Sequence, residues 1–397
     1  MTGNPLVLSM VISIFESRQA AAAEAALLGV STTIAKDPKK KSGVSKEDLL
    51  DEVDVEMPRS VVELYRVAST TMLDRLERKE RADKQQSKSM VPIPQLRKLL
   101  EAAFFQTHAA ERRIIRLGDL QTAALGLANP EELKAIQLRT AFGDERAEAV
   151  ALACRNLPAP RQDEVNSICE RVRQDRLPLL SLLSMMPIEM QSSHLSFQEY
   201  FAAQAICNGM KLPPEAAKPW CWSPWWGNTL RLGNEIGKDF ETGLLSASAE
   251  AGSTTLNLRA RVGGHRPTSF AAIGLLLRAV VAVDLRDNRL NDEEAALVAD
   301  AFTRTELLTK LNMAGNRIRS SGAAAIGRAL ETSSRRARTV TEVDFSRNPM
   351  CLHDPKAPKD GESKPYDGLL EIARAIAACP MILGVLLAKT SMDDDAG

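Results

Sequence analysis

The last third of this 397-residue chain repeats itself, and this repetition constrains the fold more than any other feature. Asn288 and Asn316 are 28 residues apart, and each is the asparagine of an L-x-x-L-x-L-x-x-N-x-L pattern. Self-similarity at a fixed period is typical of stacked repeat units, so the pattern predicts one strand and one helix in each copy. The apolar positions of the two copies are Val280, Val283, Leu285 and Leu290, and Leu308, Leu311, Met313 and Ile318.

Less regular copies lie on both sides of these two. A third copy contains Asn348, and its helix is delayed by a polar loop at about 351–366. A fourth strand has Thr390 in the asparagine position, and a degenerate copy begins at Leu256. The period and the helix pattern G-A-x-x-I-x-x-A-L resemble the ribonuclease-inhibitor type of leucine-rich repeat. That resemblance implies asparagine side chains bonded to the backbone between units, and a concave sheet that binds proteins.

Helical periodicity dominates the region before the repeats. Ser60 and Glu63 predict a capping box at a helix start, and the charged stretch 75–88 is expected to be a solvated tail. Residues 31–58 are expected to be a polar insertion. The other expected helices cover 1–30, 92–115, 117–127, 130–142, 145–157 and 162–174.

A short hairpin is predicted after these helices. The apolar run 179–184 and the alternating segment 188–192 flank Pro187, which favours two strands and a tight turn. Several helices followed by a small hairpin are typical of a winged-helix domain. The next helix has Ser196 as its predicted N-cap and Glu199 as its capping-box partner. Its buried stripe is expected to be Phe197, Tyr200, Phe201 and Ala205.

All four tryptophans lie within residues 220–226, in the segment PWCWSPWW. Its two prolines exclude a regular helix. Two interpretations stay open here: an aromatic contact with a ligand or protein, and a packed corner of a helical domain. We favour the packed corner, because aromatic side chains are mostly buried.

Charge and cysteine usage exclude several classes of function. Lysine plus arginine equal aspartate plus glutamate at 51 each, so we expect neither nucleic acid nor a membrane surface as a partner. The six cysteines show no zinc spacing, which favours reduced thiols in a cytoplasmic protein. The apolar run 5–15 lacks a basic flank and is too short to span a bilayer, so it is expected to begin a buried helix.

Three further segments, Ser193 to Ala203, Gly3 to Ser9 and Pro58 to Tyr65, together resemble parts of NACHT signalling ATPases, the NOD-like receptor class. Ser193 to Ala203 (SHLSFQEYFAA) looks like the signature at the end of their winged-helix domain. Gly3 to Ser9 (GNPLVLS) and Pro58 to Tyr65 (PRSVVELY) look like helical segments that follow their NTPase core. The order of these segments before the repeats fits the same family.

The resemblance implies two cofactor-binding residues. In that family the proline of G-x-P packs against the nucleotide, and the winged-helix histidine reaches the terminal phosphate of ADP. These positions correspond to Pro5 and His194 in this chain. A phosphate role for His194 is physically reasonable, because the start of a helix favours an anion. The alternative is a histidine that only packs or caps the hairpin.

One departure from the family is an absence. No G-x-x-x-x-G-K-[ST] motif occurs, and Gly233 to Asp239 (GNEIGKD) is one residue short in spacing and lacks the Ser/Thr. We therefore expect no catalytic residue, no metal site and no ATP hydrolysis by this chain itself, with ADP or ATP bound only when it is joined to an upstream core. A truncated gene model and a degenerate paralogue both explain the missing core.

The sequence thus predicts a mostly α chain with a small winged-helix hairpin, followed by a short α/β leucine-rich-repeat solenoid. The expected domains are a helical segment (1–90), a winged-helix-like domain (91–206), a second helical, tryptophan-rich segment (207–252) and the repeats (253–397). The expected function is the lid, latch and protein-binding repeats of a NACHT signalling ATPase, which self-oligomerises in its full-length form. A stand-alone repeat scaffold is the alternative; a DNA-binding winged helix is disfavoured because no basic recognition helix is visible.

Overall fold

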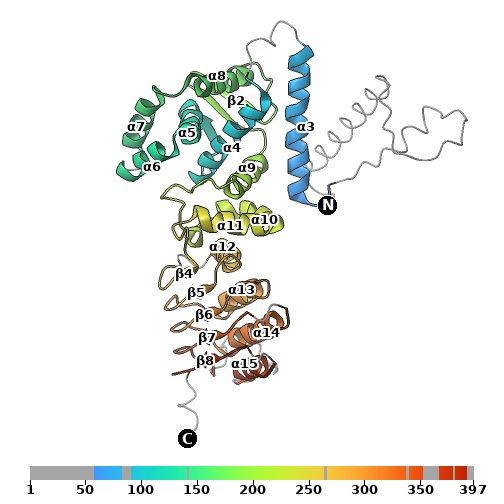
Figure 1. Cartoon of the computed structure of the whole chain (residues 1–397), viewed down its shortest axis with the longest axis vertical. Helices are drawn as coiled ribbons and strands as arrows, with labels where there is room; N and C mark the ends of the chain where they lie inside the picture. Colours follow the sequence, from blue (N-terminus) through green and yellow to red (C-terminus); the bar gives the residue numbers. More distant parts are fainter. Residues whose placement is uncertain are drawn as a thin grey trace, which may run out of the picture.

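The structure is a computed structural model that describes residues 58–82, 91–140, 143–262, 266–336, 339–351, 366–378 and 381–390. The predicted helix 1–30, residues 31–57 of the polar insertion and most of the loop 351–366 lie outside these ranges. The described part is mostly helical with small sheets, and it is elongated, with a helical half and a stack of strands and helices in sequence order (Figure 1).

The first described helix, α3 (Val61–Ala82), begins at the predicted cap. The Ser60 hydroxyl accepts the Glu63 backbone N–H at 3.1 Å, while the Glu63 carboxylate accepts the N–H of Arg59 at 2.9 Å. The prediction that residues 75–88 form a solvated tail is wrong as far as Ala82. Leu76 and Glu80 of α3 are both buried. Glu80 is buried because its carboxylate forms an ion pair with Arg171 of another helix.

Five helices follow, and four of them match the predicted segments within a few residues. They are α4 (Ile93–Ala109), α5 (Leu117–Ala128), α6 (Pro130–Arg139), α7 (Asp144–Cys154) and α8 (Ala159–Arg173). The exception is α4, which was expected to continue to residue 115. It ends at Ala109, Glu111 has a φ of 53°, and residues 114–116 form a strand instead.

The predicted hairpin is confirmed as β2 (Leu180–Met185) and β3 (Ile188–Ser192). A third strand, β1 (Ile114–Arg116), pairs antiparallel with β3 and gives the order β1-β3-β2. Ile115 lies opposite Met190, and both are buried. This pairing is the reason that α4 ends early, because the strand ladder replaces the last turns of the expected helix.

Helix α9 (Leu195–Cys207) follows β3 directly and forms the centre of the helical half. Its predicted stripe is buried, with Phe197, Tyr200, Phe201 and Ala205 each 1% exposed or less. The ring of Tyr65 from α3 stacks on Tyr200 at 5.7 Å, and Phe104 from α4 stacks on Phe201 at 5.3 Å. Three helices distant in sequence are therefore joined by aromatic contacts.

The tryptophan segment forms two short 3-10 helices, η1 (Pro219–Cys221) and η2 (Pro224–Trp226), followed by α10 (Gly227–Ile236) and α11 (Lys238–Ala247). The predicted packed corner is confirmed, because Trp220, Trp222 and Trp226 are buried and the last two stack at 3.7 Å. The segment Gly233–Asp239 contains the junction of α10 and α11 at Gly237, where φ is 81°.

The repeats form a five-stranded parallel sheet in the order β4-β5-β6-β7-β8. The helices between the strands all lie on one side of the sheet (Figure 1). The central residue of each inner strand is buried against them. The strands are β4 (Thr255–Asn257), β5 (Ala282–Asp284), β6 (Lys310–Asn312), β7 (Glu342–Asp344) and β8 (Gly384–Leu386), and the helices are α12 (Pro267–Leu277), α13 (Asp292–Phe302), α14 (Ser320–Arg336) and α15 (Asp367–Ala378).

The predicted role of the asparagines is confirmed by their hydrogen bonds. The Asn316 side-chain oxygen accepts backbone N–H groups of Asn288 and Leu290, at 2.9 and 3.1 Å. Its amide donates to the carbonyls of Leu285 and Met313, at 3.0 and 2.8 Å. Asn288 and Asn348 make the same kinds of contact in neighbouring units. Each asparagine therefore satisfies buried backbone groups of its own unit and of the one before it.

Among the described residues, no helix is both long enough and apolar enough to cross a membrane.

The hydrogen bonds of Asn288, Asn316 and Asn348 to neighbouring units form what we call the asparagine ladder. It can be tested with Asn316→Ala. The change leaves two backbone N–H groups and two carbonyls without their partner, so we expect the free energy of unfolding to fall by about 3 kcal/mol. The matched control is Asn312→Ala, whose side chain lies on the open side of the same unit, with an expected loss below about 1 kcal/mol. Urea unfolding measures both, and equal losses would contradict the assigned role.

The buried ion pair between α3 and α8 can be tested with Arg171→Met. The Arg171 guanidinium is fully buried and donates two 2.8 Å bonds to the Glu80 carboxylate. Removing the guanidinium leaves the Glu80 carboxylate buried without its partner, so we expect the free energy of unfolding to fall by about 3 kcal/mol. The exposed pair Arg81–Glu77 provides the control, where Arg81→Met should cost less than about 0.5 kcal/mol. If Arg171→Met unfolds no more easily than the control, the pair does not hold α3 in place.

Candidate functional site

The structure places His194 at the N-terminus of α9, immediately after the β2–β3 hairpin. Its Nδ1 atom accepts the backbone N–H of Ser196 at 3.2 Å and lies 2.9 Å from the Ser196 hydroxyl. His194 is therefore the N-cap of α9. Because Nδ1 accepts a backbone N–H, the proton of the neutral ring belongs on Nε2.

This geometry corrects the predicted capping box of Ser196 and Glu199. Ser196 is already inside the helix, one residue beyond its first position. The Glu199 carboxylate does not return to the helix start, because it accepts a hydrogen bond from the side chain of Asn228 in α10. Sequence spacing alone could not reveal this, since the competing partner comes from a different helix.

Burial, together with a nearby charge, sets the protonation of His194. Burial lowers the pKa of His194, and the guanidinium of Arg113 lowers it further. Burial raises the pKa of Glu199, which Asn228 and two arginines partly offset. Burial also raises the pKa of Tyr65, whose hydroxyl is bonded to Ser196. His194 is thus neutral at pH 7, and it can present one Nε2–H donor beside a cationic side chain.

This arrangement fits an anion better than a catalytic dyad. Although the Ser196 hydroxyl touches a histidine nitrogen, that nitrogen already accepts the Ser196 backbone N–H. Its lone pair is therefore not free to remove the hydroxyl proton, as nucleophilic catalysis requires. A neutral donor and an arginine at a helix N-terminus are the groups that bind phosphate in proteins. The donor set is compatible with the implied ADP phosphate.

Pro5, the second predicted nucleotide contact, lies outside the described residues. The part of the chain that the structure describes also contains no group of three histidine, cysteine, aspartate or glutamate side chains that could hold a metal ion.

The open side of the parallel sheet is a second candidate surface. One row of side chains faces away from the helices and is polar in the first four strands. Asn312 donates to Asp344 at 3.0 Å, and Arg286 makes a bidentate ion pair with Asp284. That guanidinium holds the pKa of Asp284 below its usual value. The row consists of Asn257, Asp284, Asn312, Asp344 and Leu386.

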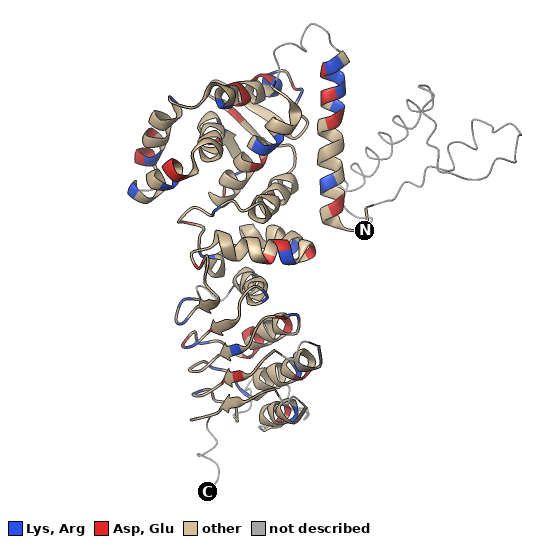
Figure 2. Cartoon of the chain, viewed as in Figure 1, with Lys and Arg blue, Asp and Glu red and all other residues tan. Residues whose placement is uncertain are grey.

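A charged contact crosses several units at the end of the strands. Asp287 bonds Arg259 at 2.8 Å and lies 3.7 Å from Arg347. Gly315 lies between them with a φ of 69°, and a Cβ there would come within 2.3 Å of the Asp287 carboxylate. The glycine thus leaves room for the carboxylate to reach across its unit. The open side offers paired charges of both signs. In Figure 2, positions of lysine or arginine and positions of aspartate or glutamate both occur along the stack.

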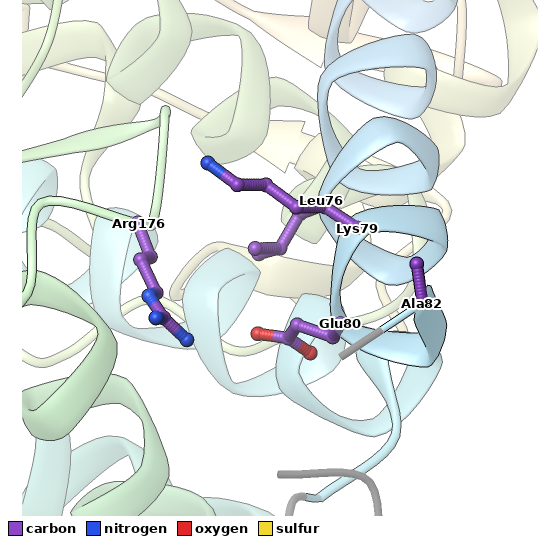
Figure 3. Close-up of a pocket in the computed structure, with 5 residues that line it drawn as sticks. All are labelled: Leu76, Lys79, Glu80, Ala82 and Arg176. Atoms are coloured by element: carbon purple, nitrogen blue, oxygen red, sulfur yellow. The ribbon is translucent and has the colours of Figure 1, made fainter. Parts of the chain in front are cut away.

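A small pocket of about 290 Å³ lies beside the C-terminal end of α3 (Figure 3). Lys79, Glu80 and Arg176 line it together with Leu76 and Ala82. The Glu80 carboxylate is already held by Arg171, so it is poorly suited to act as a free base or metal ligand. The pocket contributes no reactive group to the candidate site.

Sequence reasoning missed the environment of His108, a residue of α4 that is fully buried against the tryptophan corner. Its Nε2 lies 2.9 Å from the Thr229 hydroxyl, and its ring meets Trp226 edge-on at 4.5 Å. Its Nδ1 has no hydrogen-bond partner in the described part of the chain. The available signal was a histidine in an apolar helical stretch, which indicates burial but not the partner.

Comparisons with known proteins give little support for any assignment. Neither a protein-family model nor a curated protein matches the chain. Among solved structures, one similar chain is titled "Leiomodin-1 Actin-Binding Site 2 (ABS2)". It shares 21% sequence identity over 34% of this chain and 69% of that one, with a TM-score of 0.27. A likeness at this level carries no argument about fold or function.

The buried His108 predicts a specific dependence of stability on pH. Burial lowers its pKa in the folded chain to about 3, whereas an unfolded histidine titrates near 6.5. As the pH falls below 6.5, only the unfolded state gains this proton, so the folded state loses stability. Between pH 6.5 and pH 5 the loss from this group is about 2 kcal/mol.

The variant His108→Gln isolates that contribution. The difference in unfolding free energy between wild type and variant should shrink or reverse as the pH falls from about 7 to about 5. Urea unfolding at several pH values measures it. If the free energies of unfolding of the wild type and the variant change equally with pH, His108 is not buried as a neutral ring.

Proposed function

We propose that this chain is the regulatory and sensing part of a NACHT–leucine-rich-repeat signal-transduction ATPase. In this proposal the α9 region is a nucleotide-responsive latch, and the sheet β4–β8 is the protein-binding face of leucine-rich repeats. The helical half with its β1-β3-β2 sheet corresponds to the winged-helix and second helical domains. The nucleotide would be ADP or ATP held mainly by an upstream NTPase core.

The observation that carries the proposal is the position of His194. Its ring is fixed at the N-terminus of α9 by Nδ1, and its lowered pKa keeps it neutral. The ring can therefore offer Nε2–H to a phosphate without carrying a charge of its own. The aromatic contacts of α9 with α3 and α4 would link this contact to the packing of the helical half. A shift in phosphate occupancy could then change which packing is favoured.

The regular backbone contacts of the stack support the repeat half of the proposal. Successive strands pair in parallel, and the strands β5 and β6 are offset by 28 residues. The asparagine contacts match those implied by the ribonuclease-inhibitor type of repeat. The polar open side suits a partner with a polar surface, because its arginines and aspartates are arranged as mixed pairs.

A stand-alone repeat scaffold is the second candidate, and the asparagine ladder favours it equally. The two candidates differ in what precedes Met1 in the coding sequence. Mapping the 5′ end of the transcript tests this directly. An in-frame GxxxxGK[ST] followed by an acidic Walker B strand would support the switch, whereas a stop codon before Met1 would exclude it for this chain and leave the scaffold.

The latch itself is tested by His194→Ala in the protein that carries the upstream core. We expect retention of ADP to weaken by about tenfold to about a hundredfold, because one hydrogen bond to a charged group contributes about 1.5–3 kcal/mol. His194→Asn is the matched variant, since its side-chain oxygen can still cap α9 without reproducing the imidazole donor. Nucleotide release is measured by filter binding. If both variants release ADP at the rate of the wild-type protein, a phosphate contact by His194 is excluded.

A further inference from the structure

The loops that follow the strands of the repeat sheet are joined by backbone hydrogen bonds that continue the pairing of the strands. Asp287 donates its N–H to the carbonyl of Ala314 at 3.1 Å, and Arg317 donates to the carbonyl of Leu290 at 2.8 Å. These bonds hold the loops of successive units side by side, about 5 Å apart, as in neighbouring strands. The loops therefore form a continuous edge at the C-terminal ends of the strands.

This edge carries an excess of positive charge, although lysine plus arginine and aspartate plus glutamate balance at 51 each in the whole chain. The described stretches from the last residue of each strand toward the next helix are 257–262, 284–291, 312–319, 344–351 and 386–390. They contain eight arginine or lysine residues, three aspartates and no glutamate. The balanced charge of the whole chain therefore conceals a cationic edge.

The three aspartates of this edge are already engaged in the contacts described for the open side. Asp287 is shared by two guanidinium groups, that of Arg259 at 2.8 Å and that of Arg347 at 3.7 Å. Arg289 and Arg317 are exposed, and neither forms an ion pair with a described residue. Because like charges on neighbouring strands repel, an anion bound between these units would stabilise the arrangement.

Four exposed arginines, one from each of the units that begin with β4, β5, β6 and β7, form what we call the arginine edge: Arg259, Arg289, Arg317 and Arg347. We propose that the arginine edge binds an acidic segment of a partner protein, whose carboxylates pair with Arg289 and Arg317. Guanidinium groups suit this role, because they hold a carboxylate through two parallel N–H bonds. The inference rests on the proposed protein-binding role of the repeats, but it requires neither a nucleotide nor an upstream core.

The polar row on the open side of the sheet favours a peptide over a nucleic acid as the occupant. Asp284 and Asp344 lie in this row, and they would repel the phosphate that a nucleic acid carries at every nucleotide. In an extended peptide, alternate side chains share one face. A peptide can therefore direct its acidic side chains to the arginine edge and place uncharged groups over the aspartates.

The test is the binding of a fluorescein-labelled peptide of alternating glutamate and serine, about twelve residues long, to the 397-residue chain, followed by fluorescence anisotropy. We expect binding at about 20 mM salt that weakens by at least about tenfold at about 150 mM, because salt screens exposed charges. Arg289→Glu and Arg317→Glu should each raise the dissociation constant by at least about tenfold, since each reverses a charge at the contact. A peptide with glutamine in place of glutamate should not bind.

The matched controls are Arg304→Glu and Arg328→Glu, which reverse exposed charges after α13 and on α14, in the same two units. They should leave the dissociation constant unchanged. All four arginines are exposed, so thermal unfolding of the variants should stay at the wild-type temperature. Absence of peptide binding, or equal weakening by the controls, overturns the proposal. Tighter binding of a single-stranded oligonucleotide of equal charge overturns it in favour of a nucleic acid.

The acidic segment Asp393 to Asp395 of the chain itself is the competing occupant. A combined Asp393→Asn, Asp394→Asn and Asp395→Asn variant should bind the peptide as the wild type does. Tighter binding by this variant would assign the arginine edge to that segment and overturn the external partner. Mapping of the transcript decides the nucleotide switch, whereas this titration decides the chemistry of the partner, so failure of one leaves the other standing.

Discussion

The C-terminal half depends on the hydrogen bonds that join each unit to the next. The asparagine of one unit accepts backbone N–H groups of the preceding unit, and each strand donates to the strand that follows. Each unit depends on its neighbours for part of its buried backbone hydrogen bonds, so the stack is stable only as a series.

The helical half is organised around α9 by a different kind of contact. Aromatic rings from α3 and α4 pack on its buried stripe, and two buried polar groups lie at the joints with other helices. Arg171 is neutralised by Glu80, whereas His108 remains neutral because burial opposes its protonation. Arg171 and His108 make the arrangement of the helices more specific than apolar packing alone would. If α8 moved away from α3, or α10 away from α4, a buried polar atom would lose its partner.

The proposed latch is at the meeting point of these contacts. His194 caps α9, while Glu199 one turn later is bonded to α10 and Tyr65 reaches the same turn from α3. A ligand that engaged the Nε2 atom of His194 would act on a helix start shared by several elements. This placement explains how a small change at one ring could be transmitted through the helical half without a reactive residue.

Local patterns in the sequence determined the elements whose partners are close in sequence or strictly periodic. The 28-residue period predicted the strands, because each unit repeats the same short-range geometry, and the resemblance to the ribonuclease-inhibitor type of repeat implied the asparagine contacts. The hairpin and the cap at Ser60 followed from turn and capping chemistry. Tertiary structure alone decided the rest: β1 replaced the end of a predicted helix, Glu80 became buried, and His194 became the cap in place of Ser196. Glu80 pairs with Arg171, 91 residues away, β1 pairs with β3, and Glu199 is bonded to Asn228, 29 residues away. No local pattern encodes which distant group will arrive, although the bond of the His194 cap itself, to Ser196, is local.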